Sequence, residues 1–170
     1  MVIETDETLL LDLLNTTPVV DGTPLDQLAD AAAGRRWLAE HGQPVSDDEW
    51  HAVLAARSAL QDVVGTGAGP AALARFTEGV RYRAGFESGG VSWILELPEG
   101  RSAAARAVLT WDALRTSHPG RLRPCANSEC RLYLIDHTKS NSARWCSMAV
   151  CGNRMKARRH YQRLRATPEN

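Results

Sequence analysis

The chain has 170 residues, of which 44% are hydrophobic, so it is long enough for one domain or for one domain with a small appendage. It contains no run of about 18 apolar residues that could cross a membrane. Its acidic N-terminus lacks the basic start and the long apolar run of a secretory signal. We therefore expect a cytoplasmic protein with reduced thiols and no membrane partner.

The formal net charge is zero, but the charged residues are unevenly distributed. Residues 121–170 contain eleven Lys or Arg and three Asp or Glu, a net charge of +8, so residues 1–120 carry a net charge of −8. This division predicts an acidic body over residues 1–120 and a basic module over residues 121–170 that have different partners. A solvated basic surface without a partner is the alternative.

Apolar residues recur with helical spacing over residues 5–15, which predicts a short amphipathic helix. The pair Thr23–Pro24 resembles an N-cap followed by proline at the first helical position. We therefore expect a second helix over residues 25–32, weakened or ended by Gly34, and a third short helix over residues 35–40.

The clearest helix begins after Ser46, which forms a capping-box pattern with Glu49. Apolar side chains then follow at helical intervals as far as Val64. A glycine-rich loop over residues 65–70 comes next. Helix can resume over residues 71–79.

The period of the pattern then changes to that of a strand. Alternating side chains over residues 81–86, a turn over residues 87–90 and a second apolar run over residues 91–97 predict a β-hairpin. Another helix, centred on residues 104–114, ends before His118-Pro-Gly, where we place the domain boundary. The expected fold class is α+β: a mainly helical N-terminal body with one β-hairpin, followed by a small zinc finger that ends in a basic helix.

The four cysteines of the chain lie close together near its C-terminus, with the spacing C-x4-C-x15-C-x4-C. They are Cys125, Cys130, Cys146 and Cys151. Two close pairs joined by a linker are typical of two loops that fold around one tetrahedral ion, and zinc accepts four thiolates. Four cysteines leave no open coordination position for water or substrate, so we expect a structural zinc ion and no enzymatic activity.

Two disulfides or four buried core thiols are the alternatives to a zinc site. The expected cytoplasmic location disfavours disulfides, and the polar, arginine-rich surroundings disfavour core thiols. The module has roughly 45 residues, too few for a stable hydrophobic core alone. Zinc binding, which stabilises small fingers by roughly 10–16 kcal/mol, would supply the missing folding energy.

Residues 144–160, RWCSMAVCGNRMKARRH, resemble the motif of the CGNR zinc-finger family, which is named after the tetrapeptide at residues 151–154. Residues 125–136, CANSECRLYLID, resemble the first knuckle of that family and the strand after it. The run LLLDLLNT at residues 9–16 resembles the opening motif of the ABATE domain that usually precedes this finger. The resemblance therefore covers nearly the whole chain.

This resemblance implies a bacterial transcription regulator of a kind often described as stress-induced, with the four cysteines as zinc ligands. One departure lies at residues 138–143, where the family is commonly richer in arginine. The resemblance also suggests that Asp12, Asn15 and Thr16 line a pocket for a small-molecule effector, so that the body acts as a sensor. A polar helix face in contact with water, followed by turn residues, is the simpler interpretation.

The segment after Cys151 consists of strong helix formers and carries many cations. Such a helix can lie along phosphates or enter a major groove, and arginine can also bind guanine. We expect DNA to be the partner, with RNA as an alternative, because Tyr133 and Trp145 could stack on bases, although packing against the knuckles is the simpler role. The candidate nucleic-acid contacts are Arg144, Arg154, Lys156, Arg158, Arg159, Arg163 and Arg165.

The leading functional hypothesis is a zinc-containing, DNA-binding transcription regulator whose body senses a signal or mediates assembly. The alternatives are a protein-interaction adaptor, in which the finger docks on another protein, and a redox sensor that uses the zinc thiolates. The sequence leaves the oligomeric state, the target site and the effector open.

Overall fold

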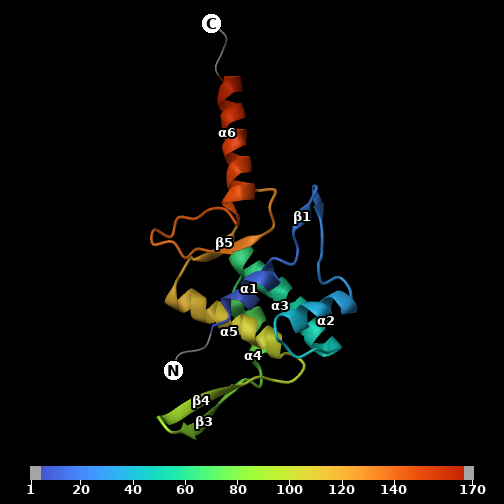
Figure 1. Ribbon diagram of the computed structural model, residues 1–170, viewed down its shortest axis with the longest axis vertical. Helices are drawn as coiled ribbons and strands as arrows, with labels where there is room; N and C mark the ends of the chain where they lie inside the picture. The colour runs from blue at the N-terminus through green and yellow to red at the C-terminus, as the bar shows by residue number, and fades with distance from the viewer. Residues whose placement is uncertain (1–4, 167–170) are drawn as a thin grey trace.

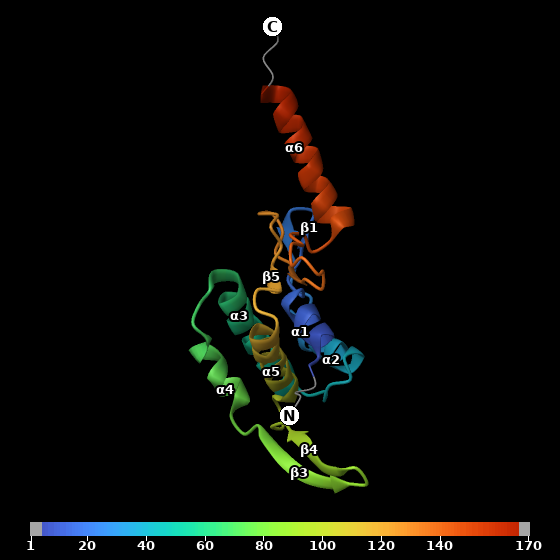
Figure 2. The same cartoon turned by 90° about the vertical axis from the view of Figure 1, so that its left-hand side faces the viewer.

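The computed structural model describes residues 5–166 and confirms the α+β class. Helices predominate, and the described strands form three antiparallel pairs, β1–β2, β3–β4 and β5–β6. The molecule is elongated, with the helical body in the middle, the hairpin β3–β4 at one end and helix α6 at the other (Figures 1 and 2). None of the described helices is long and apolar enough to cross a lipid bilayer.

Three helices form the core of the body: α1 (Glu7–Leu14), α3 (Asp47–Thr66) and α5 (Ser102–Ser117). Helix α1 confirms the first predicted helix, and its leucines at positions 9, 10, 13 and 14 are all buried. Asp6 caps α1 by accepting a hydrogen bond from the Leu9 N–H, and its own N–H donates to Thr110 Oγ1 on α5. The cap therefore also fixes α1 against α5.

The prediction for residues 25–40 is wrong in detail. Thr23–Pro24 is strand β2, which pairs with β1 (Val19–Val20), and one helix, α2 (Ala31–Glu40), follows the Asp30 N-cap. Residues 25–30 stay non-helical because tertiary contacts hold two of them. Asp26 binds the Arg57 guanidinium through two hydrogen bonds of 2.7 Å.

The second of these contacts involves Leu28, whose carbonyl accepts a hydrogen bond from Trp50 Nε1. Gly34 does not end α2. The Trp50 ring lies so close to Gly34 that a Cβ atom there would come within 2.1 Å of Trp50 Cδ1. Glycine in mid-helix thus permits α2 and α3 to approach closely.

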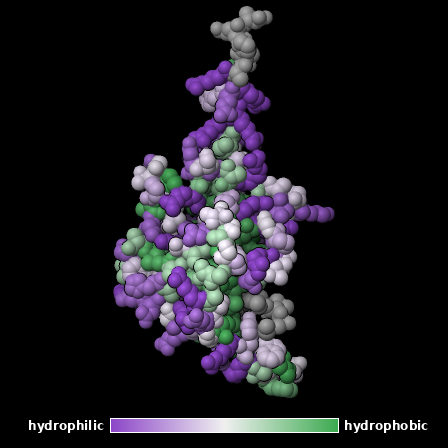
Figure 3. All heavy atoms as spheres, turned by 180° about the vertical axis from the view of Figure 1, so that it is seen from behind, coloured by the Kyte–Doolittle hydropathy of each residue, from purple (hydrophilic) through white to green (hydrophobic). Residues whose placement is uncertain are grey.

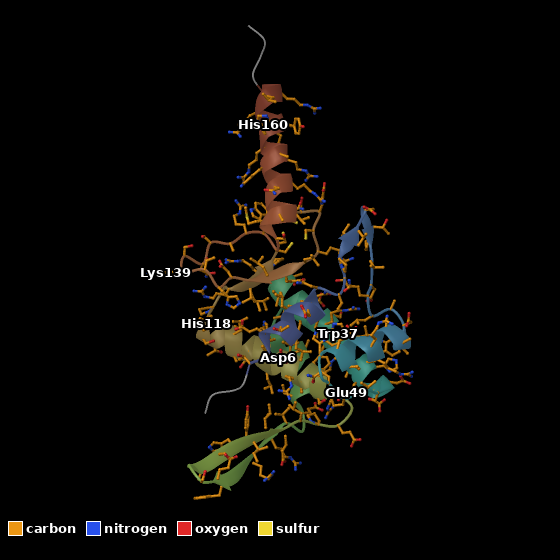
Figure 4. The ribbon with its side chains drawn as sticks, viewed as in Figure 1. Asp6, Trp37, Glu49, His118, Lys139 and His160 are labelled. Atoms are coloured by element: carbon orange, nitrogen blue, oxygen red, sulfur yellow. The ribbon has the colours of Figure 1, made fainter. Side chains whose placement is uncertain are left out.

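The predicted capping box is half confirmed. Ser46 Oγ accepts the Glu49 N–H at 3.1 Å at the start of α3, but the Glu49 carboxylate does not return to the Ser46 backbone. It is buried inside the body, where it accepts hydrogen bonds from Ser102 N, Ser102 Oγ and Ala103 N (Figure 4). Glu49 therefore caps α5, and its negative charge lies at the positive end of that helix.

The segment after α3 agrees with the sequence prediction. Gly67, in a left-handed conformation, ends α3, and a short 3-10 turn, η1 (Pro70–Leu73), leads into α4 (Ala74–Thr77). The predicted hairpin is confirmed as β3 (Arg81–Glu87) and β4 (Gly90–Glu96). It projects away from the helices (Figure 2).

The C-terminal part begins with the strand pair β5 (Leu122–Pro124) and β6 (Tyr133–Ile135). Leu122, Tyr133 and Ile135 pack against the core of the body. A π-helical turn, η2 (Met148–Gly152), then leads into α6 (Asn153–Ala166). The strand pair thus joins the body to the rest of the C-terminal part.

Replacing Glu49 by alanine should lower the free energy of unfolding by about 3 kcal/mol, because three buried donors at the start of α5 would lose their acceptor. Urea denaturation followed by circular dichroism measures this loss. Glu40→Ala, at the exposed end of α2, is the matched control and should change stability by less than about 0.5 kcal/mol. Equal effects of the two substitutions would contradict the capping role.

Candidate metal centre and basic helix

The structure brings the four cysteines together. Their sulfur atoms all lie within 4.8 Å of one another. The distance between the sulfur atoms is 3.7 Å for Cys130 and Cys146 and again for Cys146 and Cys151. A tetrahedron of thiolates around zinc, with bonds of about 2.3 Å, has edges of about 3.8 Å, so this set of thiols fits a zinc ion.

Hydrogen bonds to the sulfur atoms orient the two knuckles. The Leu132 N–H donates to Cys130 Sγ, and the Cys146 N–H donates to Cys125 Sγ. The fully buried Asn127 donates from its side-chain amide to Cys151 Sγ at 3.5 Å. Donors that point at sulfur stabilise thiolates over thiols, which is the form that binds a metal.

The thiols differ in their acidity. Burial raises the pKa of Cys130, and burial together with the neighbouring thiols raises that of Cys146 further. The pKa of Cys151 is lowered, because hydrogen bonds from Asn127 and the other thiols outweigh the effect of burial. A metal ion supplies the positive charge that keeps all four groups deprotonated at neutral pH.

Asp136 holds the loop between the two knuckles. Its buried carboxylate accepts hydrogen bonds from the backbone N–H groups of Thr138 and Ala143, at 2.8 and 2.7 Å, and from the Arg123 guanidinium at 2.5 Å. Hydrogen bonds from Thr138, with smaller contributions from Ala143 and Arg123, lower the pKa of Asp136 to about 2. Asp136 therefore stays ionised and fixes where the second cysteine pair begins.

The tetrapeptide at residues 151–154 connects the metal centre to α6. Cys151 lies in η2, and a Cβ atom on Gly152 would come within 2.8 Å of Met148 Sδ and 3.3 Å of Trp145 Cδ1. The Asn153 amide donates to the Ala149 carbonyl at 3.2 Å. Small size at Gly152 and this hydrogen bond let the chain pass from the fourth cysteine into α6 within one turn.

Helix α6 extends away from the rest of the molecule, and polar side chains predominate on the face seen in Figure 3, while Tyr161 and Leu164 are also exposed (Figures 3 and 4). His160 marks its outer half in Figure 4. Most of the predicted nucleic-acid contacts are exposed on α6 or beside it: Arg144, Arg154, Lys156, Arg159, Arg163 and Arg165. Lys156, Arg159, Gln162 and Arg163 line a shallow depression along the helix.

Several of the candidate arginines have contacts within the finger. Arg163 Nε donates to the Arg159 carbonyl at 3.4 Å. Arg158 forms an ion pair with Glu129 of the first knuckle, and the resulting hydrogen bond lowers the pKa of Glu129. The Arg144 guanidinium lies 5.1 Å from the centre of the Trp145 ring, in a cation–π contact. Arg158 therefore ties α6 to the knuckle.

The three candidate pocket residues lie at the end of α1, but their polar atoms are engaged within the fold. Thr16 Oγ1 donates to the Leu13 carbonyl and accepts from Arg57, and Asp12 lies 3.1 Å from His41 Nε2. The Asn15 amide bonds to both the backbone N–H and the carbonyl of Tyr133. Asn15 therefore connects α1 of the body to β6 of the finger through these two hydrogen bonds.

Tyr133 differs from the expectation that it packs on its knuckle. Its ring packs against the core of the body, and its hydroxyl donates to the Gln61 carbonyl on α3 at 3.4 Å. Burial there raises its pKa. Tyr133 is therefore unavailable for stacking on a base, whereas Trp145 lies beside Gly152 in the finger.

Sequence reasoning missed three residues that support the site. Asn127 and Asp136 are buried polar side chains of the finger, and Glu129 is the anion that holds Arg158. The position of Asn127 between the first two cysteines was a signal, because an Asn two residues after a ligand can bond within its own loop. It does so here, since Asn127 Oδ1 accepts the Glu129 N–H.

Two family models match the chain. The model of the CGNR zinc finger matches residues 121–164, and the ABATE model, described as "Putative stress-induced transcription regulator", matches residues 7–132. The two matches overlap in β5 and the first knuckle. A comparison with curated proteins finds no match.

Replacing Asn127 by alanine should weaken zinc binding by about 10- to 100-fold, because Cys151 would lose a buried hydrogen-bond donor. Competition with a chromophoric chelator measures the affinity. The neighbouring exposed Ser128→Ala is the matched control and should leave it unchanged. An unaltered affinity in the Asn127 variant would mean that this amide does not support the metal centre.

Proposed function

Since the chain belongs to the ABATE family, which is described as one of transcription regulators, and ends in a CGNR zinc finger, we propose that it binds DNA through the finger and α6. Cys125, Cys130, Cys146 and Cys151 would hold a structural zinc ion, which cross-links the two knuckles. Residues 121–170 form the DNA-binding module in this proposal. Residues 1–120 form the body that senses a signal or mediates assembly.

The cationic, projecting helix α6 is the main support for DNA binding. A helix whose exposed side chains are mostly polar gains little from packing on its own chain, so exposed cations such as Arg154, Lys156 and Arg159 can contact a partner. DNA presents one negative charge per about 1.7 Å of helix axis, which matches a row of arginines better than a single acidic side chain does. Arginine also forms paired hydrogen bonds to phosphate or guanine.

The finger contributes orientation. Gly152 and the Arg158–Glu129 ion pair set the direction in which α6 leaves the knuckles. The remaining candidates then contact phosphates or bases: Arg144, Arg154, Lys156, Arg159, Arg163 and Arg165. Phosphate contacts fix the position of a protein on DNA, and base contacts select the sequence.

The other parts of the proposal follow from the site. A four-thiol centre has no open position for a substrate, so we assign the protein no catalytic role. Four reduced thiols suit the cytoplasm, where DNA of a bacterial cell also lies. An effector for the body remains part of the proposal, and Asn15 would transmit its effect because it bonds to β6.

Replacing Lys156 or Arg159 by alanine should weaken DNA binding and make it less sensitive to salt. Each lost phosphate contact reduces the slope of log affinity against log salt by about 1. Fluorescence anisotropy with labelled duplex DNA over a salt series measures both quantities. Arg36→Ala, on the exposed face of α2, is the matched control and should leave the slope unchanged. Parent-like slopes in both α6 variants would contradict the proposed interface.

Removal of zinc by a chelator, or the substitution Cys146→Ser, should abolish DNA binding while most of the helical signal persists. The body has its own hydrophobic core, whereas the finger depends on its thiols. Circular dichroism and anisotropy on the same sample separate the two effects. DNA affinity that survives complete loss of zinc would exclude a role for the finger.

A further inference from the structure

The hairpin β3–β4 carries an exposed apolar face at the end of the molecule opposite to α6 (Figures 1 and 3). The exposed fractions are 85% for Phe86, 57% for Val91 and 57% for Trp93. Register places Phe86 opposite Val91, and Ala84 opposite Trp93, so these side chains share one face. A hairpin of two strands is marginal in water by itself, and an exposed cluster of this kind marks an interaction site.

The outer edge of β3 offers a row of backbone groups. Only two residues separate the paired residues Glu87 and Gly90, so this pair is hydrogen-bonded across the hairpin. From there along the strands, non-hydrogen-bonded and hydrogen-bonded pairs alternate. Tyr82, Ala84 and Phe86 therefore direct their N–H and C=O groups away from β4. No other strand among residues 5–166 covers this edge.

We propose that this edge pairs with the same edge of a second copy of the chain, antiparallel and centred on Ala84. That register uses the whole of β3 and sets Tyr82 opposite Phe86 of the second copy. On the other face it sets Arg81 opposite Glu87 of the second copy. The charges are complementary, and neither side chain has an ionic partner among the described residues.

Backbone polarity agrees with this register. In this register Ala84 lies opposite Ala84 of the second copy, and Tyr82 lies opposite Phe86. In every such pair, both residues direct their backbone N–H and C=O groups toward the other chain, so they can form hydrogen bonds. Opposite residues of an antiparallel pair lie on the same face, so the two apolar faces join into one. The turn of each hairpin then lies beside the first residues of β3 in the other copy. There, Phe86 of one copy is covered by Tyr82 of the other.

The other edge of the hairpin fits a second copy less well. Pairing of β4 with itself about Trp93 sets Glu96 opposite Gly90, without a cation, and Glu96 already pairs with Arg83 at 2.6 Å. Pairing of β3 about Arg83 would oppose two like charges. Pairing about Gly85 would leave Arg81 and Tyr82 without partners on the second strand. The register about Ala84 thus satisfies the most groups.

Sedimentation of the full chain over a range of concentrations tests the proposal. The parent should show a reversible monomer–dimer equilibrium. Arg81→Glu or Glu87→Arg should each raise the dissociation constant by about tenfold, because two ion pairs become two like-charge contacts, and the double reversal should restore it. Ala84→Pro should also weaken the dimer, since it removes an outward N–H that the hairpin does not use.

Arg36→Glu, on α2, controls for the change in net charge and should leave the dissociation constant unchanged. Circular dichroism checks that each variant keeps its fold. A parent that stays monomeric at the highest soluble concentration would overturn the proposal, as would a dimer that resists both reversals and the proline. If the hairpin variants instead weaken DNA binding by a monomer, the face contacts nucleic acid and the proposed dimer is wrong.

Discussion

The C-terminal part of the chain must hold its shape with few hydrophobic contacts, and the clustering of four sulfur atoms meets that constraint. Within residues 121–165, the buried hydrophobic side chains are Cys125, Leu134 and Cys151. Buried polar groups provide the remaining order, with Asn127 bonded to a sulfur atom and Asp136 bonded to two backbone N–H groups. A cross-link among the thiols therefore fixes the knuckles, and the knuckles fix the start of α6.

A second constraint joins this part to the body. The side-chain amide of Asn15 bonds to both backbone groups of Tyr133, as a neighbouring strand would, and the Tyr133 ring packs against the core. The Tyr133 hydroxyl, which donates to the Gln61 carbonyl, adds a third contact, on α3. Movement of α1 relative to α3 would therefore act directly on β6, one strand away from the cysteines. If the body senses a signal and the finger binds DNA, as proposed, these contacts of Asn15 and Tyr133 would couple the two.

Local patterns in the sequence predicted α1, α3, the hairpin β3–β4 and the cysteine cluster, because each depends on neighbours in the chain. The prediction over residues 25–40 was wrong because Arg57 and Trp50 hold Asp26 and Leu28 from a distance. The dipeptide Asp21-Gly22, with φ values of 49° and 79°, is a hairpin turn that the sequence does signal. No local pattern reveals that Glu49 would cap α5, since its partners are 53 and 54 residues away.

Charge and shape together decide where the proposed DNA contact can lie. The body is acidic and therefore repels phosphates. Helix α6, which has 14 residues, extends away from the body. Such a helix is about 21 Å long. Screening at physiological salt extends over only about 8 Å. The outer half of α6 therefore lies beyond the repulsion of the body. In the proposed complex, α6 would therefore meet the DNA phosphates, and the acidic body would stay clear of them.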